Sequence, residues 1–182
     1  MKLMNIADEG AQYKWQLYDL YDKAFPEQEK KPLQVMEQLA ADGKMEMLAL
    51  VDEDEFAGLA INLIDEEQNR ALLDYYAIAP EKRNGGYGSK GLEVLLERFK
   101  NYKYIFEIET QDEKAENAEE RKRRKAFYLR NGLFVNVYDT DFELLTPDGE
   151  LTFWEYVDFL REVMYEEYVE ILRPTLIAMK KK

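Results

Sequence analysis

The chain has 182 residues and is 46% hydrophobic, which suits one folded domain and excludes a disordered or collagen-like chain. Its 38 acidic and 25 basic side chains give a formal net charge of −13, so nucleic acid and anionic membranes are disfavoured as partners. The sequence contains no cysteine and no histidine, which excludes disulfides, zinc fingers, thiol nucleophiles and Ser-His-Asp triads. Any proton transfer must therefore use Asp, Glu, Tyr, Lys or water.

The N-terminal stretch MKLMNIADEG has no apolar core typical of a signal peptide, and no apolar run approaches membrane-spanning length. We therefore expect a cytoplasmic protein. Because the sequence shows no repeat, linker or domain boundary, we expect a single domain over residues 1–182.

The first half of the chain predicts a short strand at residues 1–6 and then two helices. Residues 11–25 suit a helix with aromatic side chains on one side, which Pro26 ends. Pro32 opens a second helix that runs to Ala41. Apolar runs separated by polar turns then predict three strands in an antiparallel meander. These strands are expected at residues 45–51, 55–65 and 69–80.

A glycine-rich stretch follows, and it leads into an amphipathic helix over residues 87–100. A strand at 104–110 comes next, and then a heavily charged helix over 112–131 that Gly132 ends.

Two last strands are predicted at 134–139 and 142–145. Thr152 and Glu155 have the spacing of a capping box, which opens an apolar helix over residues 152–173.

The stretch APEKRNGGYGSK, Ala79 to Lys90, places three glycines directly before a helix. Such glycines expose backbone N–H groups, whose partial positive charge adds to the helix dipole. Arg83 and Lys90 add formal charge, so the stretch predicts a phosphate or diphosphate ligand. The alternative is an ordinary strand-to-helix turn, although one turn needs fewer glycines.

Two known phosphate motifs fit less well. A Walker A loop needs Gly-Lys before Ser or Thr, whereas here Ser89 precedes Lys90. Residues 86–91 do match the dinucleotide fingerprint G-x-G-x-x-G. However, seven residues separate Ile78 from Gly86, and the preceding strands form a meander rather than repeated βαβ units.

A longer pattern carries a more specific resemblance. YAIAPEKRNGGYGSKGLEVLLE runs from a strand through a Pro-containing turn into a helix, with Arg-x-x-Gly-x-Gly at residues 83–88. KAFYLRNGLFV, residues 125–135, follows the pattern Phe-Tyr-x-x-x-Gly-Phe with Leu133 in the last place. In these motifs and in element order, residues 1–145 resemble the GNAT family of acetyl-CoA-dependent N-acetyltransferases.

The resemblance implies an α+β fold of the three-layer sandwich type, with a mixed, mostly antiparallel central sheet and helices on both faces. It implies acetyl-CoA as the co-substrate, no metal, and an amine of a small molecule or peptide as the acceptor. The acidic net charge favours a cationic acceptor. The family attacks the thioester directly, without an acyl-enzyme, which agrees with the missing cysteine.

The resemblance also implies contacts to the coenzyme. Backbone groups of Ala77 and Ile78 would bond the pantetheine arm and the thioester oxygen, in a slot where two strands splay apart. Arg121 stands where many members have an asparagine that contacts the coenzyme, and we expect Arg121 to replace it. The turn expected to hold the diphosphate comprises Arg83, Asn84, Gly85, Gly86, Tyr87, Gly88 and Ser89.

Tyr128 matches the tyrosine that protonates the departing thiolate in this family. A phenol of pKa about 10 is protonated at neutral pH and can donate to a thiolate of pKa about 8.5. The alternative is a core tyrosine on an amphipathic helix.

The attacking amine must first lose a proton, and the candidate bases are Asp74, Glu107 and Glu109, acting directly or through water. Asp74 lies in the apolar run LLDYY, where burial would raise its pKa. Glu109 ends its strand near the expected slot and is the base that we favour. Each carboxylate could instead be a solvated strand residue.

Other features leave alternatives open. The basic run over residues 121–125 is either a salt-bridged helix face or, in part, a contact to coenzyme phosphate. The helix over 152–173 packs on the core, walls the acceptor pocket or pairs two subunits of a homodimer. The alternative functions are a nicotinamide- or flavin-linked oxidoreductase and a catalytically silent acyl-CoA-binding domain.

Overall fold

The computed structural model describes residues 1–136 and 142–163. Within these residues, seven strands form one sheet in the order β1-β2-β3-β4-β5-β7-β6. Its strands are β1 (Lys2–Asn5), β2 (Met45–Asp52), β3 (Glu55–Asp65), β4 (Arg70–Ile78), β5 (Lys103–Glu109), β6 (Phe134–Asn136) and β7 (Phe142–Thr146). β4 and β5 run parallel, and the other neighbouring pairs are antiparallel. The predicted meander and the mixed, mostly antiparallel sheet are confirmed.

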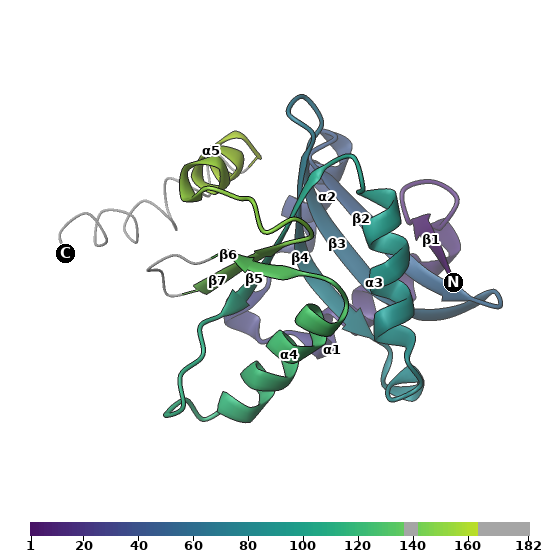
Figure 1. Cartoon of the computed structure of the whole chain (residues 1–182). Coiled ribbons are helices and arrows are strands. Elements are labelled where there is room, and N and C mark those ends of the chain that lie inside the picture. The colour runs from purple at the N-terminus through teal and green to yellow at the C-terminus, as the bar shows by residue number, and fades with distance from the viewer. Residues whose placement is uncertain (137–141, 164–182) are drawn as a thin grey trace.

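Helices cover both faces of this sheet. They are α1 (Lys14–Ala24), α2 (Leu33–Ala41), α3 (Tyr87–Arg98), α4 (Ala118–Arg130) and α5 (Phe153–Val163), with short 3₁₀ turns η1 (Ala11–Tyr13), η2 (Glu27–Glu29) and η3 (Pro80–Lys82). α3 and α4 lie on the near face in Figure 1, and α1 and α2 lie on the far face. The two faces form separate apolar clusters, one under α1, α2 and α5 and one under α3 and α4. None of the described helices is long and apolar enough to cross a membrane.

Some predicted elements reach past the described residues. β6 confirms the strand predicted at 134–139 as far as Asn136, and 137–139 lie outside the described residues. α5 confirms the last helix as far as Val163, and its predicted continuation to 173 also lies outside them. A role of that helix in a homodimer, and the single domain over 1–182, stay predictions.

Helix α4 begins six residues later than the sequence predicted, at Ala118 instead of Asp112. The carboxylate of Asp112 accepts the backbone N–H of Lys114 at 2.9 Å, and its carbonyl oxygen accepts the N–H of Ala115 at 3.1 Å. These local bonds give the backbone a turn in place of a helix. The predicted pairing along the charged helix is confirmed, since Arg124 bridges to Glu120 at 3.2 Å.

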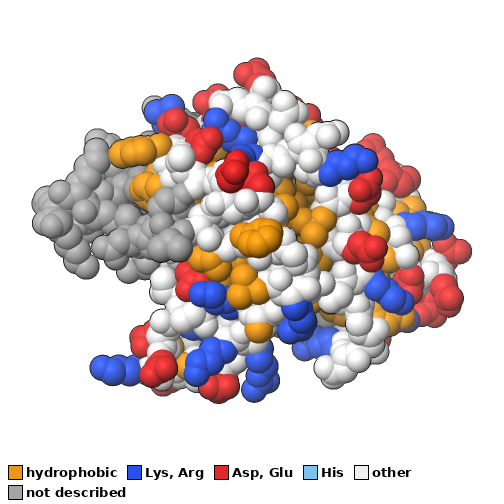
Figure 2. Space-filling model, in the orientation of Figure 1, with side chains coloured by type: hydrophobic (Ala, Val, Ile, Leu, Met, Phe, Trp, Pro, Cys, Tyr) orange, Lys and Arg blue, Asp and Glu red, His pale blue; other side chains and the backbone are white. Residues whose placement is uncertain are grey.

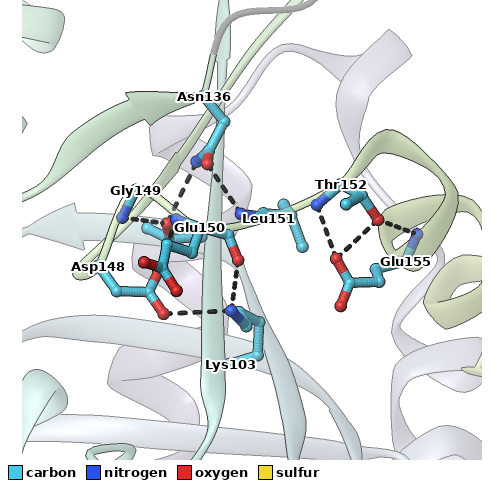
Figure 3. A network of polar contacts seen from close by, with 9 residues as sticks. Lys103, Asn136, Asp148, Gly149, Glu150, Leu151, Thr152 and Glu155 are labelled. Carbon is cyan, nitrogen blue, oxygen red and sulfur yellow. Dashed lines mark hydrogen bonds and ion pairs between the residues drawn. The ribbon is translucent and has the colours of Figure 1, made fainter.

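A polar network fixes the start of α5 against the sheet (Figure 3). The amide of Asn136 on β6 donates to Thr146 at 3.2 Å, and its carbonyl oxygen accepts the N–H of Leu151 at 2.9 Å. Thr152 and Glu155 form the predicted capping box, with the Glu155 N–H donating to the Thr152 hydroxyl at 3.2 Å. The start of α5 is therefore held at a defined position against the sheet, where its side chains reach β3, β5 and β7.

Candidate active site

A gap opens between the two parallel strands at the centre of the sheet. The last paired residues are Leu73 on β4 and Phe106 on β5. Beyond them, β4 continues on β3 as far as Ile78, and β5 continues on β7 as far as Glu109. The two strands thus diverge toward their C-terminal ends and leave facing backbone edges unpaired (Figure 1).

The gap begins at a β-bulge. On β3, Ile61 and Asn62 are neighbours, but their partners on β4 are Tyr75 and Leu73, so Asp74 is the extra residue. A bulge bends its strand and increases the local twist. The bulge therefore turns the end of β4 away from β5 at the point where their pairing stops.

The register decides which backbone groups of β4 face the gap. The N–H of Ala79 donates to the carbonyl oxygen of Ala57 on β3 at 2.9 Å. Because backbone groups alternate along a strand, those of Ala77 also turn toward β3, whereas those of Tyr76 and Ile78 face the gap. Of the two residues expected at the pantetheine arm, only Ile78 offers its amide there.

The glycine turn ends at the first turn of α3. Gly86 caps this helix in the left-handed conformation, with φ 78°, and Asn84 also has a positive φ of 62°. Within the described chain no side chain caps α3, and the N–H of Lys90 is the first to bond inside the helix, to Gly86. The amides of Tyr87, Gly88 and Ser89 therefore point outward at the positive end of the helix dipole.

Two glycines of this helix have different surroundings. A Cβ on Gly88 would lie 3.4 Å from the Phe127 ring, which is ordinary contact. A Cβ on Gly91 would lie 2.4 Å from the Tyr76 hydroxyl. Gly91 thus lets α3 approach β4, which accounts for the last glycine of G-x-G-x-x-G. The dinucleotide alternative does not fit the fold, because β4 and β5 are the one parallel pair among the described strands.

Basic side chains gather over α4 and along the lower edge of the face in Figure 2. The Arg83 Nε donates to the carbonyl oxygen of Ile78 at 3.1 Å. This bond joins the glycine turn to the end of β4. Arg121 donates to Asn117 at 2.7 Å and to the carbonyl oxygen of Thr110 at 2.9 Å. A contact from Arg121 to the coenzyme would require these bonds to be replaced.

Tyr128 on α4 lies on the α3 side of the sheet, next to the gap. It is buried, and its ring packs against Phe106 with centroids 5.5 Å apart. Burial raises the pKa of Tyr128 to about 12, and nearby Arg124 acts in the opposite direction. The hydroxyl therefore keeps its proton at neutral pH.

Glu109, the base favoured from the sequence, is held by α4. Its carboxylate accepts a bond from Arg124 at 2.8 Å and from the Asn117 amide at 2.9 Å, and it lies 3.2 Å from Arg121. These contacts join the end of β5 to the start of α4, so the geometry gives Glu109 a structural use.

Asp74, the bulged residue of β4, is also paired. Both of its carboxylate oxygens contact the Lys31 ammonium, at 2.8 and 3.0 Å, and both side chains are mostly buried. Lys31 lies in the segment before α2, and sequence reasoning did not find it.

Glu107 has a different environment. The hydroxyl of Tyr156 on α5, itself buried, donates a hydrogen bond to the Glu107 carboxylate. Glu107 keeps an exposed surface, yet the surrounding protein raises its pKa. The carboxylate is thus accessible from solvent, while the protein around it disfavours its charge. Sequence reasoning missed Tyr156, whose only signal was its place on the apolar face of a helix.

A comparison with family profiles decides the identity. The profile described as Acetyltransferase (GNAT) family matches residues 14–132, which is more than half of the chain. The chain belongs to the GNAT family of acetyltransferases. A comparison with curated proteins found no match to this sequence.

Solved structures share the fold of this GNAT protein. A GNAT-family protein from Bacteroides thetaiotaomicron has a TM-score of 0.72 and 22% identity, covering 94% of this chain and 98% of that one. The spermidine N-acetyltransferase from Vibrio cholerae, in complex with CoA and spermine, has a TM-score of 0.56 and 12% identity, covering 80% and 93%. The aminoglycoside 6′-N-acetyltransferase from Enterococcus faecium has a TM-score of 0.56 and 15% identity, covering 80% and 94%.

Proposed function

We propose that this GNAT protein transfers the acetyl group of acetyl-CoA to a primary amine of a small molecule or peptide, by direct attack and without an acyl-enzyme. The observation that carries the proposal is the gap between β4 and β5 beside the uncapped start of α3. These two features give one ligand both an open strand edge and a site for its diphosphate.

The diphosphate would lie against the outward amides of Tyr87, Gly88 and Ser89. Anions are stabilised there by unpaired N–H groups and by the helix dipole. The pantetheine arm would follow β4, where the amide of Ile78 faces the gap.

The thioester would then lie at the start of the gap, near the ring pair of Phe106 and Tyr128. The amine nitrogen attacks the carbonyl carbon, a C–N bond forms and the C–S bond breaks. Tyr128 donates its hydroxyl hydrogen to the negative charge that develops on sulfur. Its raised pKa, about 12, keeps that proton in place at neutral pH until the thiolate leaves.

The acceptor we propose is cationic. The carboxylates of Asp74 and Glu107 stand on the two strands at the start of the gap, and Lys31 neutralises only the first by a direct ion pair. The spermidine and aminoglycoside acetyltransferases that share this fold are named for amine substrates. These neighbours support an amine as the class of acceptor, and a screen of amines would identify the individual substrate.

Two measurements test the proposal. A thermal-shift panel with acetyl-CoA, CoA, NAD and FAD should show stabilisation by the first two alone. Thiol release from acetyl-CoA should then appear with at least one amine of a panel containing putrescine, spermidine, kanamycin and a short peptide. Stabilisation by NAD or FAD alone would favour the oxidoreductase, and coenzyme binding without turnover of any amine would favour the silent domain.

A further inference from the structure

The start of the gap places one carboxylate on each strand. Asp74 directly follows Leu73, the last paired residue of β4, and Glu107 directly follows Phe106, the last paired residue of β5. Both are thus the first residues of their strands that no longer pair with each other. Both carboxylates therefore stand at the narrow end of the gap, where the two strands begin to separate.

Glu107 and Tyr128 lie on opposite faces of the sheet. Ile105 packs in the cluster under α1, α2 and α5, and Glu107 follows two residues later on the same face, where it meets Tyr156. Phe106, between them, packs with Tyr128 in the cluster under α3 and α4. A thioester in the gap would therefore have the phenol on one side and Glu107 on the other.

The three carboxylates near the gap differ in what already holds them. Asp74 forms an ion pair with Lys31, and Glu109 contacts two arginines and an amide. Glu107 forms one neutral hydrogen bond, from Tyr156, and keeps an exposed surface. The donors around Asp74 and Glu109 already occupy both oxygens of each carboxylate, whereas the one neutral bond to Glu107 leaves its remaining lone pairs available.

We infer that Glu107 is the proton acceptor of the reaction and that Tyr156 is its positioning residue; the inference rests on the proposed acetyl transfer. The ammonium group of the acceptor gives one proton to the Glu107 carboxylate, directly or through one water. The neutral nitrogen attacks the thioester carbon, the C–S bond breaks and the Tyr128 proton passes to sulfur. The second nitrogen proton restores the Tyr128 hydroxyl through solvent, and Glu107 then releases its proton. The products are the N-acetyl amine, CoA thiol and one released proton.

The charged groups around Glu107 support its role as the proton acceptor. Burial raises the pKa of Glu107, the negative charge of Asp74 raises it further, and Tyr156 and Lys31 lower it. A raised pKa brings a carboxylate closer to the range in which it can take a proton from an amine at neutral pH. Tyr156 is fixed by packing on Phe142 and Phe153, with centroids 5.5 and 6.4 Å away.

The test compares Glu107→Gln with Glu109→Gln, the same change two residues later on the same strand. Both use the amine of the panel that the wild-type protein acetylates fastest, over pH 5 to 9. We expect Glu107→Gln to lower kcat by roughly 100-fold or more. The variant should also lose the acidic limb, which is the fall in kcat/KM at low pH that protonation of an enzyme group causes. Glu109→Gln tests the rival base, and a larger loss of kcat and of the acidic limb in this variant than in Glu107→Gln would overturn the inference. Acetyl-CoA affinity by calorimetry should stay unchanged in Glu107→Gln.

Tyr156→Phe tests the positioning role through the pH dependence of the rate, which a purely structural role of Tyr156 would leave unchanged. Loss of its hydrogen bond raises the pKa of Glu107, so the acidic limb should shift to higher pH while the plateau rate changes less. An unchanged profile and rate in Glu107→Gln would overturn the inference while the acetyl transfer stands. If the wild-type protein acetylates none of the amines, the proposed function fails and the inference fails with it.

Discussion

Tyr76 donates its hydroxyl to the carbonyl oxygen of Gly88 at 2.6 Å, which ties the gap edge of β4 to the first turn of α3. The two features that the proposed coenzyme needs, an open strand edge and an uncapped helix start, are thus fixed relative to each other. Burial raises the pKa of Tyr76, so this hydroxyl keeps its proton and the bond persists across physiological pH.

The close approach at Gly91 can be tested by packing. Gly91→Ala places a methyl group 2.4 Å from the Tyr76 hydroxyl, so we expect a loss of about 1–3 kcal/mol in the free energy of unfolding. In a Tyr76→Phe background the missing oxygen gives room, and the same change should cost less. Urea unfolding of the four proteins measures the coupling, and purely additive losses would contradict the close contact.

Substitution at the glycine turn tests the diphosphate site. Gly88→Glu adds bulk and negative charge where the outward amides lie, so acetyl-CoA affinity should fall at least about 100-fold, or about 2.7 kcal/mol. Asn101→Glu adds the same side chain beyond the other end of α3 and should leave the affinity unchanged. Calorimetry that gives equal affinities for the two variants would show that the coenzyme does not use this turn.

Removal of one hydroxyl tests the leaving-group role. Tyr128→Phe keeps the ring against Phe106 but loses the donor to sulfur, so kcat should fall roughly 100-fold with little change in acetyl-CoA affinity. Tyr102→Phe is the control, since its hydroxyl bonds Glu66 on the exposed surface. An unaltered kcat in Tyr128→Phe would make this residue a core tyrosine only.

The sequence predicted the structural features that depend on residues close together in the chain. The turn glycines, the meander and the capping box at Thr152 follow from local backbone chemistry, and all three occur. The start of α4 was misplaced because the side chain of Asp112 offers its own backbone a competing turn.

Contacts between distant residues could not be predicted in this way. Tyr156 meets Glu107 across 49 residues and Lys31 meets Asp74 across 43, and neither spacing has a periodic signature. Glu107 and Glu109 also look alike in sequence. What separates them is the helix that reaches each one, α5 for the first and α4 for the second.

The raised pKa of Glu107 also predicts a cost in stability. The folded protein binds a proton at Glu107 more tightly than the unfolded chain does, so this group lowers stability as pH rises from about 4.5 through its folded pKa. Glu107→Gln removes the charge that burial penalises. The variant should therefore unfold at a higher temperature than the wild type at pH 8, and the difference should shrink toward pH 4.5. A difference that does not depend on pH would contradict the shift.

A crystal structure of the protein with acetyl-CoA or CoA bound tests most directly whether the coenzyme lies between β4 and the start of α3. We expect diphosphate oxygens within hydrogen-bond distance of the amides of Tyr87, Gly88 and Ser89, and the sulfur in the gap between β4 and β5. A coenzyme bound elsewhere, with the start of α3 empty and the gap closed to the thioester, would contradict this placement.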